Sequence, residues 1–293
     1  MELSGVIPPI TTPFHNGEPA LELLEDNIRK WNQTQLSGYL VLGSNGEAVY
    51  LDEQEKCSVV RKAREAVPPS KCLMVGTGSE STRETIRLTN QMVDCGADCG
   101  LVAPPFYFKA GMREPILRDH FTAVAEAARM PILLYNVPQF TGVNLEPGLV
   151  ARLSEHPNIV GIKDSQGNVG QLHEYLYSSH PDFRVFVGSA PVFFPSLCLG
   201  VHGGILAVAN VIPEICIQIF ELFQQGRFEE ARDLQTRMTP LAKAVTVRYG
   251  IGGLKAVMDR AGYFGGEPRL PLQRPAPEVT NELQALLLAL QDI

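Results

Sequence analysis

The sequence lacks any hydrophobic run long enough to cross a membrane, and it lacks a recognisable leader. Its most apolar stretch, residues 201–220, is interrupted by polar residues and a proline, namely His202, Asn210, Pro213, Glu214 and Gln218. A transmembrane helix needs about 20 consecutive, mainly apolar residues. The N-terminal residues MELSGVIPPITTPF have neither the basic start nor the apolar segment of a signal peptide. We therefore expect no membrane partner and a cytoplasmic location.

Residue clusters typical of metal sites and redox motifs are also missing. The six cysteines form no CxxC pair, and no group of cysteine and histidine has the spacing of a zinc site. The six histidines are scattered, with no HxH or HExxH motif. We expect reduced thiols and no metal.

The chain has no excess of positive charge. Its 25 basic and 32 acidic residues give a formal net charge of −7, whereas proteins that bind nucleic acid usually present a basic surface. We therefore expect no nucleic-acid partner. The rest of the composition, 45% hydrophobic and 19% charged, is ordinary for a globular enzyme. The length of 293 residues fits either two ordinary domains or one large α/β barrel with an extension.

Short apolar runs alternate with longer helical patterns along most of the chain. Eight such runs begin near Val6, Gly38, Cys72, Gly100, Pro131, Ile159, Arg184 and Gly203. Their starts lie 19 to 34 residues apart, and a strand–loop–helix–loop unit needs about 30 residues. The runs are continuously apolar, as parallel strands buried on both faces are. The pattern predicts a (β/α)8 TIM barrel over residues 1–226.

The main alternative is a doubly wound open sheet. That fold usually has a glycine-rich phosphate turn after its first strand, where this chain has PPITTPF. After residue 226, helical patterns cover residues 228–238, 241–261 and 279–290, with an extended loop predicted at 262–277. No linker rich in proline, glycine or serine precedes them. We therefore predict that residues 227–293 form a C-terminal helical extension packed on the barrel.

One lysine stands where the active site of a TIM barrel forms, at the C-terminal end of a strand. Lys163 directly follows the apolar run 159–162, whereas the other seven lysines lie in stretches where we expect a solvated charge. Loss of hydration disfavours the charged form of an amine and leaves more of the neutral nucleophile for attack on a carbonyl. Lys163 is thus a candidate Schiff-base residue; the alternative is an ion pair with Asp164.

Further polar residues stand at predicted strand ends. Tyr135 ends the fifth run, and Tyr107 lies in PPFYF after the fourth; by position alone, each could instead be a packing aromatic. The loop GSNGE, which contains Ser44 and Asn45, follows the second run. Backbone N–H groups in such a loop can bind a carboxylate, although a simple capped turn is the alternative.

In combination, these motifs resemble the dihydrodipicolinate synthase / N-acetylneuraminate lyase family of class I pyruvate aldolases. The matching segments are PPITTPF, GSNGE, GTGSEST, PPFYF, YNVP, GIKDSQGN, VGSA, GGILAVANV and RYGIGGLKAVMD, in this order along essentially the whole chain. The resemblance implies a (β/α)8 barrel with a C-terminal helical extension. It also implies a homotetramer, built as a dimer of dimers.

The resemblance implies roles for individual residues. Lys163 would form the imine with pyruvate, and Tyr135 would relay protons. Ser44 would connect Tyr135 to Tyr107, which would reach into the site of a neighbouring subunit. The backbone N–H groups of Ser44 and Asn45 would hold the pyruvoyl carboxylate. The pyruvate pocket would be lined by Gly188 and Ile205.

The residues after YNVP bear on the choice of substrate. Synthases of the family normally have an arginine two residues after this motif, which binds the carboxylate of aspartate semialdehyde; here Phe140 stands at that position. Loss of such a charge-assisted hydrogen bond costs about 1.5–3 kcal/mol, although Arg113 or another cation could replace it. Phe140 would also crowd the entrance for the long polyol of N-acetylneuraminate. Asn45 and Ser165 resemble the 4-hydroxy-2-oxoglutarate aldolase branch, and both could bond a hydroxyl near C4.

These features predict a Schiff-base aldolase that cleaves 4-hydroxy-2-oxoglutarate to pyruvate and glyoxylate without a metal or organic cofactor. Lys163 would form an iminium at C2, Tyr135 would take the proton of the C4 hydroxyl, and the C3–C4 bond would break. The alternatives within the family are a 2-keto-3-deoxy sugar-acid aldolase and a 4-hydroxy-tetrahydrodipicolinate synthase. The alternative outside catalysis is a silent relative that only binds a pyruvoyl group.

Overall fold

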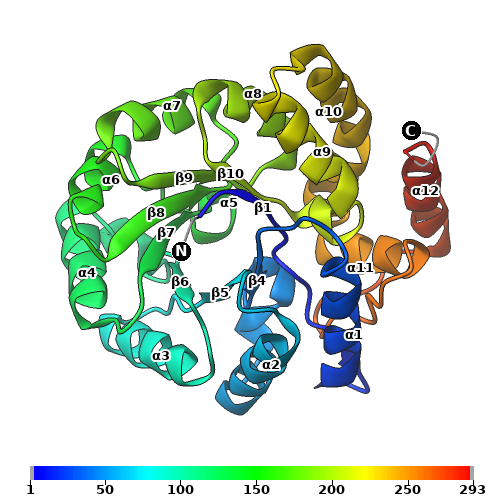
Figure 1. The fold of residues 1–293 in the computed structure, drawn as a ribbon. Coiled ribbons are helices and arrows are strands. Elements are labelled where there is room, and N and C mark those ends of the chain that lie inside the picture. Colours follow the sequence, from blue (N-terminus) through cyan, green and yellow to red (C-terminus); the bar gives the residue numbers. More distant parts are fainter. Residues whose placement is uncertain (1–2, 291–293) are drawn as a thin grey trace.

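Eight parallel strands form a nearly closed barrel in the computed structural model, which describes residues 3–290 (Figure 1). The strands are β1 (Gly5–Ile7), β4 (Gly38–Val41), β5 (Cys72–Gly76), β6 (Cys99–Val102), β7 (Ile132–Asn136), β8 (Ile159–Asp164), β9 (Arg184–Val187) and β10 (Gly203–Ile205). Their order in the sheet is β1-β10-β9-β8-β7-β6-β5-β4. The predicted TIM barrel is confirmed, and each predicted strand begins within one residue of an observed one.

Prolines limit the hydrogen bonding at the seam between β1 and β4. Pro8 and Pro9 have no N–H to donate, so β1 ends before them. Beyond β1, Pro9 forms an isolated parallel bridge with Leu40, and Ile10 N donates to Leu40 O at 2.9 Å. The chain therefore continues along β4 without a regular ladder.

Helices cover the outside of the strands (Figure 1). They are α1 (Leu21–Trp31), α2 (Glu53–Ala66), α3 (Thr82–Asp94), α4 (Glu114–Ala127), α6 (Pro147–Ser154), α7 (Val169–Ser178), α8 (Phe193–Leu199) and α9 (Pro213–Gln224). The short helix α5 (Pro138–Thr141) directly follows β7 and lies inside this ring of helices in Figure 1. Asp52 and Glu55 form a capping box at α2, and Ser81 Oγ accepts from Glu84 N at the start of α3. The short hairpin of β2 (Phe14–His15) and β3 (Glu18–Pro19) was not anticipated from the sequence.

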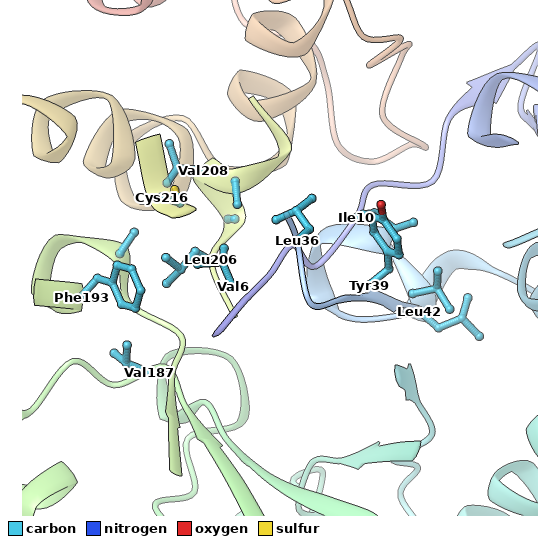
Figure 2. Packing of buried hydrophobic residues seen from close by; sticks show 14 of the residues in the cluster. Val6, Ile10, Leu36, Tyr39, Leu42, Val187, Phe193, Leu206, Val208 and Cys216 are labelled. Carbon is cyan, nitrogen blue, oxygen red and sulfur yellow. The ribbon is translucent and has the colours of Figure 1, made fainter. Parts of the chain in front are cut away.

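The buried apolar residues form two clusters, one on each face of the sheet. Successive residues of a strand point to opposite faces, so neighbours such as Val6 and Ile7 belong to different clusters. Val6 packs outward with Val187, Leu206 and Phe193 between the strands and the helices (Figure 2). Ile7 belongs to the cluster inside the barrel, whose buried members are Leu3, Ile7, Leu40, Cys72, Met74, Cys99, Leu101, Leu133, Tyr135, Val137, Phe186 and Ile205. Apolar packing therefore fills the barrel interior.

Three helices follow the barrel: α10 (Phe228–Lys243), α11 (Gly250–Arg260) and α12 (Pro277–Leu288). A π-helical segment, Ala244–Arg248, interrupts the single helix that the sequence predicts over 241–261. Helix α10 packs on α9, and α11 packs on α12. Asn27 Nδ2 of α1 donates to Phe264 O in the loop after α11 at 2.8 Å. A C-terminal helical extension is thus confirmed, whereas its exact boundary at residue 226 stays a prediction.

Within residues 3–290, no helix has both the length and the apolarity needed to cross a membrane. The cysteines, Cys57, Cys72, Cys95, Cys99, Cys198 and Cys216, are all free thiols. In the same part of the chain, no three His, Cys, Asp or Glu side chains gather into a candidate metal site.

Candidate active site

Lys163 and Tyr135 lie side by side on neighbouring strands. The register of β7 and β8 places Tyr135 opposite Lys163, so both side chains emerge on the same face of the sheet. Lys163 Nζ lies 4.5 Å from the centre of the Tyr135 ring. The two residues are only 4% and 7% exposed. The fold therefore brings the predicted nucleophile next to the predicted proton carrier, at the end of the barrel where the strands finish.

Asp164 does not pair with Lys163. It is the next residue of β8 and points to the opposite face, where its Oδ1 accepts from Asn136 Nδ2 at 2.7 Å. Its Oδ2 accepts from Gly167 N at 3.4 Å. Burial raises the pKa of the Asp164 carboxyl, and the hydrogen bond from Asn136 opposes that shift. The ion-pair alternative for Lys163 is therefore wrong.

A buried polar network behind β7 was missed by the sequence analysis. Asn136, which follows Tyr135, donates from Nδ2 to Asn144 Oδ1 at 2.9 Å and accepts from Leu145 N at 3.0 Å. Tyr175 OH donates to Leu145 O at 2.5 Å. These bonds fix the strand end that positions Tyr135. In the sequence, the signal for this network was the asparagine of YNVP, a polar residue at the end of an apolar run.

The predicted GSNGE loop follows β4 and reaches Tyr135 at the same end of the barrel. It contains a short 3-10 helix, Ser44–Gly46, and Ser44 Oγ lies 3.4 Å from Tyr135 OH. The N–H groups of Ser44 and Asn45 are the first two of this helix, positions that have no carbonyl partner within a helix. Asn45 Nδ2 is buried and has no hydrogen-bond partner among residues 3–290. The loop therefore offers hydrogen-bond donors to an anion or an oxygen-rich ligand.

Gly188, Ser165 and Lys163 meet beyond the ends of β8 and β9. A Cβ atom on Gly188 would lie 2.1 Å from Ser165 Oγ and 3.0 Å from Lys163 Cε. Gly188 N donates to Asp164 O at 2.5 Å, which fixes this close approach. Ile205 is fully buried in the same interior cluster as Tyr135. The absence of a side chain at residue 188 thus leaves room for the Lys163 side chain.

Tyr107 and Phe140 lie apart from this cluster in the single chain. Tyr107 is 76% exposed, in the loop before the 3-10 helix Lys109–Gly111, and its ring contacts Phe108 edge-on. Within residues 3–290, no hydrogen bond joins Tyr107 to Ser44. Phe140, in α5, is 66% exposed. One chain therefore brings together the residues around Lys163 but leaves these two aromatic rings open to solvent.

The expectation that all the other lysines would be solvated is wrong for Lys255. Its side chain is fully buried on α11, and its Nζ lies 2.5 Å from Glu47 Oε1. Lys255 stands between Leu254 and Ala256, in an apolar stretch of RYGIGGLKAVMD. In the sequence, this apolar context was the signal that the Lys255 ammonium would be buried and would need a carboxylate partner.

Comparison with known proteins agrees with this architecture. The model of the dihydrodipicolinate synthetase family matches residues 2–290. The chain is 35% identical to "Probable 4-hydroxy-2-oxoglutarate aldolase, mitochondrial" of Emericella nidulans, over 96% of this chain and 92% of that protein. It is also 35% identical to a 4-hydroxy-tetrahydrodipicolinate synthase of Methanoculleus marisnigri, over 97% and 98% of the two chains.

A solved structure shares the fold at similar coverage. It is a prophage protein of the dihydrodipicolinic acid synthase family from Escherichia coli K12, in complex with pyruvate. The TM-score is 0.91 at 28% identity, and the match covers 98% of each chain.

Proposed function

Because the chain belongs to the dihydrodipicolinate synthetase family, we propose that this lyase forms a Schiff base between Lys163 and the ketone of a 2-oxo acid. The observation that supports this role is the buried contact between Lys163 Nζ and the Tyr135 ring, at 4.5 Å. The surrounding interior cluster is apolar, and Lys163 has no carboxylate partner among the described residues. An amine in such surroundings is favourable for nucleophilic attack on a carbonyl.

The proposed reaction is a retro-aldol cleavage. Lys163 attacks C2 of the substrate, and one proton of its amine passes to the C2 oxygen. Tyr135 then gives its proton to the hydroxyl formed at C2, which leaves as water and leaves an iminium. The resulting phenolate takes the proton of the C4 hydroxyl, the C3–C4 bond breaks, and its electron pair moves into the iminium to give an enamine. Protonation at C3 and hydrolysis then release pyruvate and free Lys163. Each step uses groups of this chain and water, with no metal or organic cofactor.

The GSNGE loop is proposed to bind the carboxylate next to the reacting ketone. The N–H groups of Ser44 and Asn45 are the donors, while Ser44 Oγ, 3.4 Å from Tyr135 OH, holds the phenol in place. Gly188 and Ile205 line the space for the methyl end of pyruvate. The buried, unpaired Asn45 Nδ2 and the Ser165 hydroxyl are the proposed partners for polar groups near C4.

The proposed substrate is 4-hydroxy-2-oxoglutarate, cleaved to pyruvate and glyoxylate. The Emericella nidulans relative is named for this substrate, and the position of the synthase arginine holds Phe140, which cannot pair with a carboxylate. The second candidate is 4-hydroxy-tetrahydrodipicolinate synthase activity, because the Methanoculleus marisnigri relative is equally similar and named so. We further propose that the protein is cytoplasmic and assembles as a homotetramer.

Pyruvate release from a panel of 2-oxo acids tests the substrate. We expect kcat/KM for 4-hydroxy-2-oxoglutarate, or for a short 2-keto-3-deoxy acid, to exceed that for condensation of aspartate semialdehyde with pyruvate by about ten- to a hundredfold, because Phe140 supplies no charge. Asn45→Ala should lower cleavage of 4-hydroxy-2-oxoglutarate more than it lowers imine formation with pyruvate. A higher kcat/KM for the condensation than for every hydroxy-oxo acid would assign the synthase activity instead.

A second experiment addresses Tyr107. If its exposed side chain completes the site of a neighbouring subunit, Tyr107→Phe should lower kcat by about tenfold while the melting temperature stays unchanged. Phe108→Leu, one residue away and similarly exposed, is the matched control for loss of surface packing. Sedimentation at assay concentrations reports the assembly. A fully active monomer would contradict the shared site.

A further inference from the structure

A fully buried ion pair joins the GSNGE loop to the C-terminal extension. Glu47, the last residue of the motif, and Lys255, on α11, are both completely inaccessible to solvent, and Glu47 Oε1 lies 2.5 Å from Lys255 Nζ. Burial lowers the pKa of the Lys255 ammonium, and Glu47 opposes that shift. Two charges withdrawn from water need further hydrogen bonds to be tolerated. The other hydrogen bonds of Glu47 and Lys255 therefore identify the segments that the ion pair connects.

The other hydrogen bonds of the pair go to backbone groups of segments next to the loop. Lys255 Nζ donates to Thr12 O at 2.8 Å and to Glu267 O at 3.1 Å. Glu47 Oε2 accepts from Arg269 N at 2.8 Å. Thr12 Oγ1 in turn donates to Gly46 O at 2.7 Å. The pair thus ties the loop to the segment after β1 and to the chain beyond α11.

The backbone of Glu47 explains why the loop needs this support. Its φ is +54°, in the left-handed region that residues with a side chain rarely adopt. Such a conformation persists only where the surroundings enforce it. Glu47 ends the 3-10 helix that begins at Ser44, and its N–H donates to Ser44 O at 3.1 Å. The left-handed turn at Glu47 therefore sets the direction of the Ser44 and Asn45 backbone.

We propose that Glu47 and Lys255 are positioning residues for substrate binding: their buried ion pair holds the Ser44–Asn45 backbone in the conformation that accepts the carboxylate of a 2-oxo acid. The inference rests on the proposed function, because it takes the loop as the carboxylate site. It gives the C-terminal extension a role in substrate binding. Neither residue touches the substrate, so the effect appears in binding of the carboxylate rather than in the chemistry at Lys163.

The test measures the pyruvate concentration that half-saturates borohydride trapping on Lys163, read by intact mass. Lys255→Met leaves the Glu47 carboxylate buried without its counter-ion, and Glu47→Gln keeps the shape but can satisfy only one of its two former partners. Each single variant should raise the half-saturating concentration by about tenfold or more, with a smaller fall in the maximal rate of trapping. Trapping of hydroxyacetone, which has the ketone but no carboxylate, should change little.

The double variant Glu47→Gln, Lys255→Met separates positioning from loss of stability. It removes both charges together, so it should melt at a higher temperature than Lys255→Met and recover part of the affinity for pyruvate. Leu283→Ala, which opens a cavity between α12 and α11 without removing either charge, is the control for a destabilised extension. At a matched loss of melting temperature, Leu283→Ala should leave the half-saturating concentration unchanged.

Failure of the proposed function and failure of the positioning role give different results. Absence of trapping in the wild-type protein would refute the proposed function itself. Normal wild-type trapping with an unchanged pyruvate requirement in the Glu47→Gln variant, which makes the milder change, would overturn the positioning role. The positioning role would also be overturned if Leu283→Ala raised the half-saturating pyruvate concentration as much as Lys255→Met does. A fall in the trapping of hydroxyacetone in parallel with that of pyruvate would overturn it as well.

Discussion

Replacement of Lys163 by methionine is expected to lower kcat by at least about a thousandfold and to abolish covalent trapping of pyruvate. Methionine has nearly the same length and suits the apolar interior around Tyr135, so the fold should survive. The change removes the amine that forms the iminium, and without the iminium the electron pair of the C3–C4 bond has no acceptor. Intact-mass analysis after pyruvate and borohydride, followed by peptide mapping, locates any adduct.

Lys71 provides a matched control for this experiment. Burial lowers the pKa of its ammonium, and its Nζ lies 5.8 Å from the centre of the Tyr39 ring. It precedes β5, however, at the N-terminal end of the strand, far along the barrel axis from the predicted active face. Lys71→Met should trap pyruvate and turn over like the wild type. An adduct on Lys71, or on any lysine other than Lys163, would rule out the proposed mechanism.

Gly188→Ala is expected to lower kcat/KM by about a hundredfold. The added Cβ would meet Ser165 Oγ at 2.1 Å and Lys163 Cε at 3.0 Å. Both distances are shorter than van der Waals contact, so Ser165 Oγ must turn away and the Lys163 side chain must shift beside Tyr135 by a few tenths of an ångström. The effect should appear in the rate of imine trapping as well as in turnover, because the nucleophile itself is displaced.

Two further variants test whether the clash at residue 188 causes the loss of activity. Gly148→Ala adds the same methyl group on α6, where the nearest atom would lie 4.0 Å away, and should leave activity unchanged. Ser165→Ala combined with Gly188→Ala removes the closest of the clashing atoms and should restore part of the trapping rate. Wild-type kcat/KM in the single Gly188→Ala variant would contradict the packing described here. A circular dichroism melt of each variant reports on the fold separately from activity.

The barrel itself could be predicted from local patterns. Its strands read as continuous apolar runs because both faces of a parallel sheet are buried, and α2 and α3 begin with side chains, Asp52 and Ser81, that cap their N-termini. The pattern did not predict every local feature of the backbone. The π-helical turn at Ala244–Arg248 divides a helix that looks continuous in sequence, because hydrophobic periodicity does not resolve a one-residue change in hydrogen-bond spacing.

The residues that could carry the chemistry were recognisable from the sequence alone. Lys163 and Tyr135 stand at strand ends, and parallel strands of a barrel bring their C-terminal ends to one face. The pairing of charges, in contrast, depends on the three-dimensional fold. Asp164 faces away from Lys163, and Lys255, more than 200 residues from Glu47 in sequence, forms a buried ion pair with it. Strand order and helix docking bring such groups together, and a one-dimensional pattern contains no distance between segments so far apart.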